Sequence, residues 1–281
     1  MDSSTFFGIS TMSYIVAMMV YITYLAFRKP QIGIIATSVT ITGFVSQTLA
    51  ILMRWREFYE IGRMGILRAA PFTNLYESLV FFVWCLILAY LVIEFRYKNK
   101  SFGAFVTPVA GLALAFIDLT GMNKEIQPLV PALQSNWLTI HVTTCFFGYA
   151  SFAVSFGISI LYLIRDREGG EPAGVSRWLP SAPILDEINY KSIVIGFPML
   201  TLGIVTGAAW ANYAWGTYWS WDPKETWSLI TWFIYAAFLH ARLTRDWRGR
   251  KTAILSIIGF LAVLFTYFGV NYLLSGLHSY L

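Results

Sequence analysis

Long apolar runs separated by short polar segments make up most of the chain. Each run carries few charges and reaches about the 20 residues that a helix needs to cross a bilayer. Eight segments fit, at about 6–27, 32–53, 75–95, 101–118, 137–164, 190–211, 225–243 and 252–273. The pattern predicts an all-α fold, a polytopic membrane helix bundle of about eight transmembrane helices, with one integral membrane domain over 1–281.

The fourth segment is the shortest and carries Pro108 and Gly111. Neighbouring helices can satisfy the backbone groups that a proline frees within a membrane. We therefore expect this segment to span as well.

Composition narrows the class of protein. The chain is 57% hydrophobic and 12% charged, whereas soluble domains carry about 25% charged residues. This excludes an ordinary soluble enzyme, a disordered chain and a fibrous repeat. Cys85 and Cys145 lie inside apolar runs and are expected to be buried thiols. The net charge of +5 is interpreted as loop charge that orients the chain in a lipid bilayer, so no nucleic acid partner is expected.

The distribution of Lys and Arg predicts the orientation of the chain. Fourteen of the 20 basic residues fall in the loops on one side of the eight predicted spans. The richer side is cytoplasmic by the positive-inside rule, which places both termini outside. The loops 54–74, 119–136 and 212–224 are then also outside.

Four of the six remaining basic residues crowd the first outer loop, against this bias: Arg54, Arg56, Arg63 and Arg68. Such a cluster could meet an anionic ligand group, for example a propionate, or be simply solvated.

Tryptophan is concentrated near one outer loop, at about 212–225. Six of the 11 tryptophans fall between Trp210 and Trp232. An interfacial aromatic belt explains some of them, and Asp222, Pro223 and Glu225 form a good helix start, with N-cap, N1 and N3 residues. The density exceeds what a belt needs. Flat, polarizable rings suit a large, flat, apolar ligand with polar edges, such as a porphyrin or a quinone.

Three histidines occupy two depths. His141 lies about 6 Å below the outer start of its span, and His278 lies just past the outer end of the last span. Two imidazoles there could ligate one iron from opposite sides. His240 lies about 22 Å along its span, too deep to share that iron. If it ligates a metal, another subunit must supply the second ligand; otherwise it pairs with a polar group or snorkels beside Arg242. Three histidines are too few for a diheme cytochrome b.

These residues resemble a known family. Residues 215–225 (WGTYWSWDPKE) resemble the tryptophan-rich WWD signature of heme-handling proteins in cytochrome c maturation. Flanking histidine motifs of that family are similar to residues 137–142 (WLTIHV), 239–242 (LHAR) and 271–278 (NYLLSGLH). Residues 71–78 (PFTNLYES) resemble a motif of the CcsA or ResC branch, sometimes also called CcsB.

The resemblance implies a subunit of the system II cytochrome c synthetase. Such a subunit pairs with a CcsB/ResB-type subunit, carries heme b outward, and presents it to the CxxCH thiols of apocytochrome c, which thioredoxin-like proteins keep reduced. His141 and His278 would ligate the outer heme iron, and His240 an inner heme. Trp215, Trp219, Trp221 and Asp222 would hold the outer porphyrin. The implied location is the bacterial cytoplasmic membrane, with the WWD loop on the periplasmic face.

Two other functions fit the same residues. One is a heme transporter that does not attach its cargo, and the other is a quinone- or heme-binding respiratory subunit. No catalytic residue is assigned. Glu77 and Asp222 are candidates for a general base, but both stand where helix capping is the expected role.

Overall fold

The computed structural model describes residues 3–62, 65–72, 74–120, 122, 124–126, 129–167 and 176–274. All regular structure in these ranges is helical, and they contain no strand. The chain divides into two compact units, Met1–Gln134 and Ser135–Leu281, which are described one at a time. The single domain over 1–281 stays a prediction.

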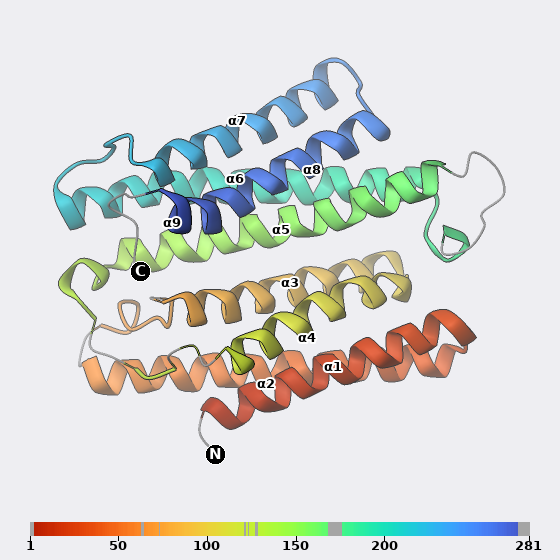
Figure 1. Cartoon of the computed structure of the whole chain (residues 1–281), viewed down its shortest axis with the longest axis horizontal. Coiled ribbons are helices and arrows are strands. Elements are labelled where there is room, and N and C mark those ends of the chain that lie inside the picture. Colours follow the sequence, from red (N-terminus) through yellow and green to blue (C-terminus); the bar gives the residue numbers. More distant parts are fainter. Residues whose placement is uncertain are drawn as a thin grey trace. The chain divides into compact units, whose positions relative to one another are not determined.

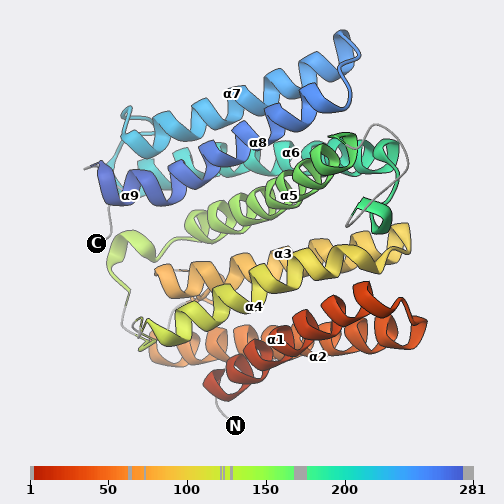
Figure 2. The ribbon, with the colours of Figure 1, turned by 45° about the vertical axis from the view of Figure 1, so that its right-hand side comes forward.

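The first unit consists of four long helices that lie side by side in both views (Figures 1 and 2). They are α1 (Ser3–Phe27), α2 (Pro30–Gly62), α3 (Leu75–Tyr97) and α4 (Gly103–Leu119). A 3-10 turn at Lys100–Phe102 leads into α4, which continues through Pro108.

Buried polar groups join the helices of the first unit. Glu94 of α3, 2% exposed, accepts hydrogen bonds from Tyr21 of α1 (2.8 Å), Thr37 of α2 (2.5 Å) and Lys100 (2.7 Å). Polar groups inside a membrane bundle need such partners, because neither lipid nor apolar side chains can supply them. This network therefore holds three helices together at the end near the 97–100 turn.

The second unit contains the remaining helices: α5 (Asn136–Arg167), α6 (Ala182–Trp215), α7 (Pro223–Thr244), α8 (Arg250–Leu264) and α9 (Val270–Leu273). A π-helical turn, Phe265–Gly269, joins α8 to α9. In Figures 1 and 2, α5 and α6 lie alongside each other, and α7 and α8 cover them.

The core of the second unit is aromatic and tightly packed. The ring of Phe152 on α5 stacks on that of Tyr235 on α7, with centroids 3.6 Å apart and planes 7° from parallel. Glycines bring α5 and α6 together: a Cβ on Gly148 would lie 3.2 Å from the carbonyl oxygen of Gly196. Close backbone approach through small residues is the usual way that membrane helices associate.

The predicted spans agree closely with the helices. Seven helical segments are long and apolar enough to cross a membrane, and they match every predicted span except 225–243. That span corresponds to α7, which has 22 residues but is less apolar than the seven. The polytopic helix bundle is confirmed. The outside position of both termini stays a prediction.

Two helices extend well beyond the apolar spans. α2 continues to Gly62, so Arg54 and Arg56, expected in a loop, lie on its last turns. No glycine or proline interrupts this stretch, and an i,i+4 pair between Arg56 and Glu60 supports it (2.7 Å). α6 starts at Ala182, because Ser181 at the N-cap and Pro183 in the first turn form a start signal. The length of an apolar run therefore reports the thickness of the membrane and does not show where the helix begins or ends.

Candidate functional site

His141 lies near the start of α5 and points toward α6. Its Nδ1 lies 2.7 Å from the carbonyl oxygen of Gly203. A carbonyl can only accept a hydrogen bond, so Nδ1 is the donor, and in the neutral imidazole Nε2 then carries the lone pair. A hydrogen bond of this kind orients most metal-ligating histidines and fixes their tautomer. The contact of Nδ1 with Gly203 is thus of the kind that a metal-ligating histidine makes through its other ring nitrogen.

The surface of α6 is shaped around this imidazole. A Cβ added to Gly207 would lie 2.6 Å from His141 Nδ1 and 2.7 Å from Cε1. The indole of Trp210, which is 2% exposed, stacks over the imidazole, with centroids 6.2 Å apart and planes 14° from parallel. Three residues of one face of α6 therefore surround the ring.

The tryptophan-rich segment divides between a helix end and a loop. Trp215, expected in the outer loop, is the last residue of α6, and its ring meets Trp210 edge-on at 4.9 Å. Gly216 ends the helix in the left-handed conformation, φ +81°, which glycine adopts without strain. Trp210 thus links His141 to Trp215 through ring contacts.

The rest of the loop holds Trp221 exposed. Its ring meets that of Trp219 edge-on at 5.8 Å, and its side chain is 68% exposed. The backbone of Trp221 has φ +60°, a conformation that costs a bulky residue free energy. Such strain persists only where the surroundings impose it.

The surroundings are a capping box at the start of α7. Asp222 accepts from the backbone N–H of Lys224 (2.9 Å). Glu225 Oε2 accepts in return from the N–H groups of Asp222 (3.2 Å) and Ser220 (2.8 Å). The helix-start interpretation of Asp222, Pro223 and Glu225 is confirmed. Asp222 is 6% exposed and its carboxylate accepts the capping hydrogen bond, so its role in this structure is to hold the shape of the loop.

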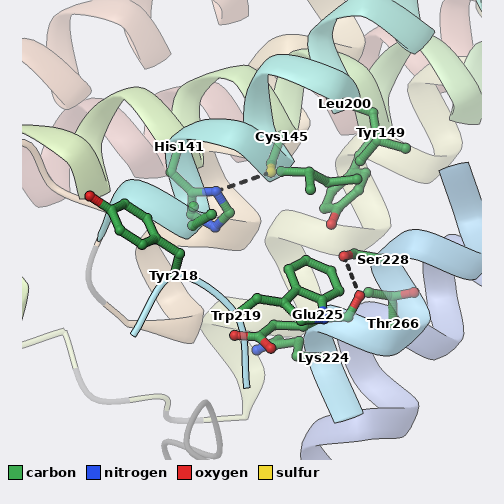
Figure 3. Close-up of a pocket in the computed structure, with 13 residues that line it drawn as sticks. His141, Cys145, Tyr149, Leu200, Tyr218, Trp219, Lys224, Glu225, Ser228 and Thr266 are labelled. Atoms are coloured by element: carbon green, nitrogen blue, oxygen red, sulfur yellow. Dashed lines mark hydrogen bonds between the residues drawn. The ribbon is translucent and has the colours of Figure 1, made fainter. Parts of the chain in front are cut away.

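A small pocket lies between the imidazole and the start of α7. Figure 3 shows His141 and Cys145 on one side, with Trp219, Lys224 and Glu225 across from them. The cavity is about 90 Å³, room for a few water molecules and far too little for a porphyrin. A macrocycle that meets His141 must therefore lie outside this pocket.

His240 is exposed on α7. It is the eighteenth residue of that helix, about 26 Å from the first residue, so it is remote from the loop that precedes α7. Phe233 and Ile230, about two and three turns away on the same face, are also exposed. His278 lies outside the described residues, and its role stays a prediction.

The arginines expected in the first outer loop do not form one cluster, as far as the structure describes them. Arg54 is 5% exposed and pairs with buried Glu77 at 3.0 Å, so it is not a solvated loop charge. Arg56 and Arg68 are exposed, and Arg63 lies outside the described residues. The proposed use of Glu77 as a general base is also unsupported, because its carboxylate neutralises Arg54.

The sequence reasoning missed Gly203 and Gly207. They are spaced as G-x-x-x-G within an apolar helix, a known signal for close helix contact. The signal predicts that α6 is approached closely, and the structure adds that His141 and Cys145 are the approaching side chains.

Comparisons with known proteins agree with the motifs. A family model described as cytochrome C assembly protein matches residues 72–278. Three relatives, all named cytochrome c biogenesis protein CcsA, come from Chlamydomonas reinhardtii (44% identity, 83% of this chain, 64% of that protein), Gloeobacter violaceus (38%, 91% and 89%) and Pyropia yezoensis (40%, 95% and 93%). The match to the Chlamydomonas protein thus spans less than two thirds of its length.

A solved structure shares the fold. The protein named cytochrome c heme lyase CcmF superposes with a TM-score of 0.68 at 16% sequence identity, covering 94% of this chain and 46% of that one. At this identity the likeness concerns the helical fold alone.

Proposed function

We propose, from the premise that this chain belongs to the cytochrome c assembly protein family, that it is the membrane subunit of a system II cytochrome c synthetase. It carries heme b, its cargo, from the cytoplasmic side to an outer site. There it presents the heme for thioether attachment to the CxxCH motif of apocytochrome c.

One observation carries this proposal: the prepared imidazole of His141. Its proton is on Nδ1, directed at Gly203 (2.7 Å), so the lone pair of Nε2 can ligate iron. Trp210 adjoins it and contacts Trp215 in turn, and the loop with Trp219 and exposed Trp221 leaves from the end of the same helix. The donor set suits a heme that lies across the outer end of this unit.

We assign the roles by the resemblance of the motifs. His141 and His278 are the two axial ligands of the outer heme, and Trp215, Trp219, Trp221 and Asp222 form or shape the surface that receives the porphyrin. His240, exposed on α7, ligates an inner heme with a second ligand from a CcsB/ResB-type partner. The chain acts as one heme-handling domain over 1–281.

The attachment needs no protein acid or base. Each cysteine thiol adds across one heme vinyl group: an S–C bond forms, and the thiol hydrogen passes to the vinyl group, with no net oxidation. Holding thiol and vinyl together supplies the rate. The thiols must be reduced, which is the part of thioredoxin-like proteins. One axial imidazole leaves as the histidine of CxxCH replaces it.

The membrane is the bacterial cytoplasmic membrane, with the WWD loop on the periplasmic side and both termini outside. This assignment is supported by the fourteen basic residues on the opposite side. It also places the exposed Trp221 where a secreted apocytochrome can reach it.

Replacing the ligands tests the proposal. His141→Gly or His278→Gly, co-expressed with the partner subunit and an apocytochrome, is expected to abolish covalent heme staining, and added imidazole should restore part of it by filling the ligand gap. His240→Gly should lower heme at both sites. Full activity in both His141→Gly and His278→Gly would remove them as ligands, and normal outer heme in His240→Gly would refute the inner-to-outer route.

The two alternatives separate in the same experiment. A heme transporter without ligation activity would accumulate heme yet give no covalent product on denaturing gels. A quinone-binding respiratory subunit would purify with its partner without a bis-imidazole heme spectrum.

A further inference from the structure

We infer that Gly203, Gly207 and Trp210 of α6 are positioning residues for the axial imidazole of His141. They hold the ring in the tautomer and the plane in which Nε2 faces the heme iron. This inference rests on the proposed function, because it takes His141 as an iron ligand.

The first contact fixes the tautomer. The carbonyl oxygen of Gly203 lies 2.7 Å from Nδ1, whereas Cys145 Sγ lies farther away, at 3.7 Å. A second partner of this kind makes a ligating imidazole more basic and sets its direction. The acceptor is a backbone atom of a membrane helix, so it stays in place without any side-chain rotamer.

The second contact is the space at Gly207. Its missing side chain leaves room for the edge of the imidazole, since a Cβ would lie 2.6 Å from Nδ1 and 2.7 Å from Cε1. Separations under 3.0 Å force something to move. An alanine here would push the ring off the Gly203 carbonyl or turn it about its Cα–Cβ bond.

The third contact covers the ring. Trp210 is buried and lies nearly parallel to the imidazole, at 14° and 6.2 Å between centroids. It comes one turn after Gly207 on α6, so the acceptor, the gap and the stacked ring follow one another along a single helix face. The imidazole is therefore limited in direction, in position and in tilt.

Helix packing alone does not account for this arrangement. Gly148 also brings α5 and α6 close, but the atoms nearest to its added Cβ would be backbone atoms, with Gly196 O and Leu200 N both at 3.2 Å. Gly207, in contrast, contacts a functional side chain. The two glycines therefore separate a packing role from a positioning role.

The test compares Gly207→Ala, Gly148→Ala and Gly157→Ala in the complete complex with its partner subunit. The absorption and resonance Raman spectra of the heme are recorded with and without imidazole. Gly207→Ala should lose about tenfold or more of the six-coordinate low-spin heme, and imidazole should restore it. Gly157 has nothing within 4 Å of its added Cβ, so it should tolerate alanine. Gly148→Ala should keep the low-spin spectrum in the fraction of the protein that folds.

A double variant covers the case in which Gly207→Ala fails to accumulate. If the clash is with the imidazole, Gly207→Ala/His141→Gly should accumulate and respond to imidazole like His141→Gly alone, because its effects are not additive. A double variant that accumulates far less than His141→Gly would overturn the inference, as would a wild-type spectrum for Gly207→Ala or the same spectral loss in Gly148→Ala. A heme spectrum unchanged in His141→Gly would instead contradict the proposed function.

Discussion

The side chain of Lys224 donates to Oδ1 of Asn271 at 2.8 Å, joining the first turn of α7 to α9. Asn271 in turn donates to the carbonyl of Tyr267 (2.8 Å), within the π-helical region. Burial lowers the pKa of Lys224 from 10.5 to about 8, while nearby Asp222 partly opposes the shift. The residue lies just before the predicted span 225–243.

This pKa predicts a pH dependence of stability. In the unfolded chain the pKa of Lys224 is near its ordinary value of 10.5, so between pH 8 and 10 the unfolded chain holds more protons than the folded one. Stability from this group therefore rises with pH across that window. Lys224→Met removes the effect: its unfolding midpoint in detergent should rise less than that of wild type between pH 8 and 10.

An exposed lysine provides the control for this measurement. Lys251 stands at the start of α8 in the same unit and is exposed. Lys251→Met should follow the wild-type curve with a constant offset. Parallel curves for wild type and Lys224→Met would show that the ammonium is not desolvated as the structure implies.

The second prediction concerns Glu225, whose carboxylate holds the turn that presents Trp221. Glu225→Ala removes the acceptor for the N–H groups of Ser220 and Asp222, which should cost about 1 kcal/mol and let Trp221 leave its positive φ. Heme retained after purification should fall. Glu225→Gln keeps an acceptor oxygen and should retain more heme than Glu225→Ala. Equal heme in wild type and Glu225→Ala would show that the loop's shape does not matter for binding.

The third prediction concerns the buried pair in the first unit. Arg54 and Glu77 are 6% and 1% exposed in their side chains. Arg54→Met leaves the Glu77 carboxylate buried without its partner, so it should destabilise the chain by about 3–5 kcal/mol. Arg54→Met/Glu77→Leu should recover most of that loss. The measurement is the thermal midpoint in detergent.

Arg56 is the matched control for Arg54. Its side chain is 79% exposed and pairs with Glu60 one turn away, so Arg56→Met should change stability by less than about 1 kcal/mol. A large loss in Arg56→Met, or a double variant as unstable as Arg54→Met, would contradict the assignment of Arg54 as a structural charge.

The fold was largely predictable because apolar length reports membrane thickness. The ends of the helices were less predictable. α2 continues past Met53 through polar residues, which form ion pairs with one another and with Glu77. Arg54 shows the limit: no pattern along the chain says that a basic residue in a polar stretch will meet a carboxylate 23 positions away. Such a pairing depends on how α2 and α3 pack.

At the site, the sequence predicted residue types better than their surroundings. Asp222, Pro223 and Glu225 predicted the capping box, because its hydrogen bonds join residues that are close in the sequence. The partner of His141 was not predictable, since Gly203 lies 62 residues away and contributes a backbone atom. Glycine spacing could have indicated the close contact of α6, but not which side chain would fill it.

The last prediction concerns the end of the second unit that we propose to face the cytoplasm. Asp186 of α6 pairs with Arg242 of α7 (2.7 Å) and accepts from the N–H of Gly249 (2.8 Å), so one carboxylate joins three segments. Asp186→Asn should cost about 1.5–3 kcal/mol. Arg242 is two residues from His240, so Asp186→Asn should also lower the amount of heme bound at the proposed inner site.

Glu187→Gln is the control. Glu187 forms an exposed i,i+4 pair with Lys191, and its replacement should cost less than about 0.5 kcal/mol. Unfolding midpoints and the heme spectrum of each variant are compared with wild type. Equal losses in the two variants would mean that Asp186 contributes only as one more surface charge.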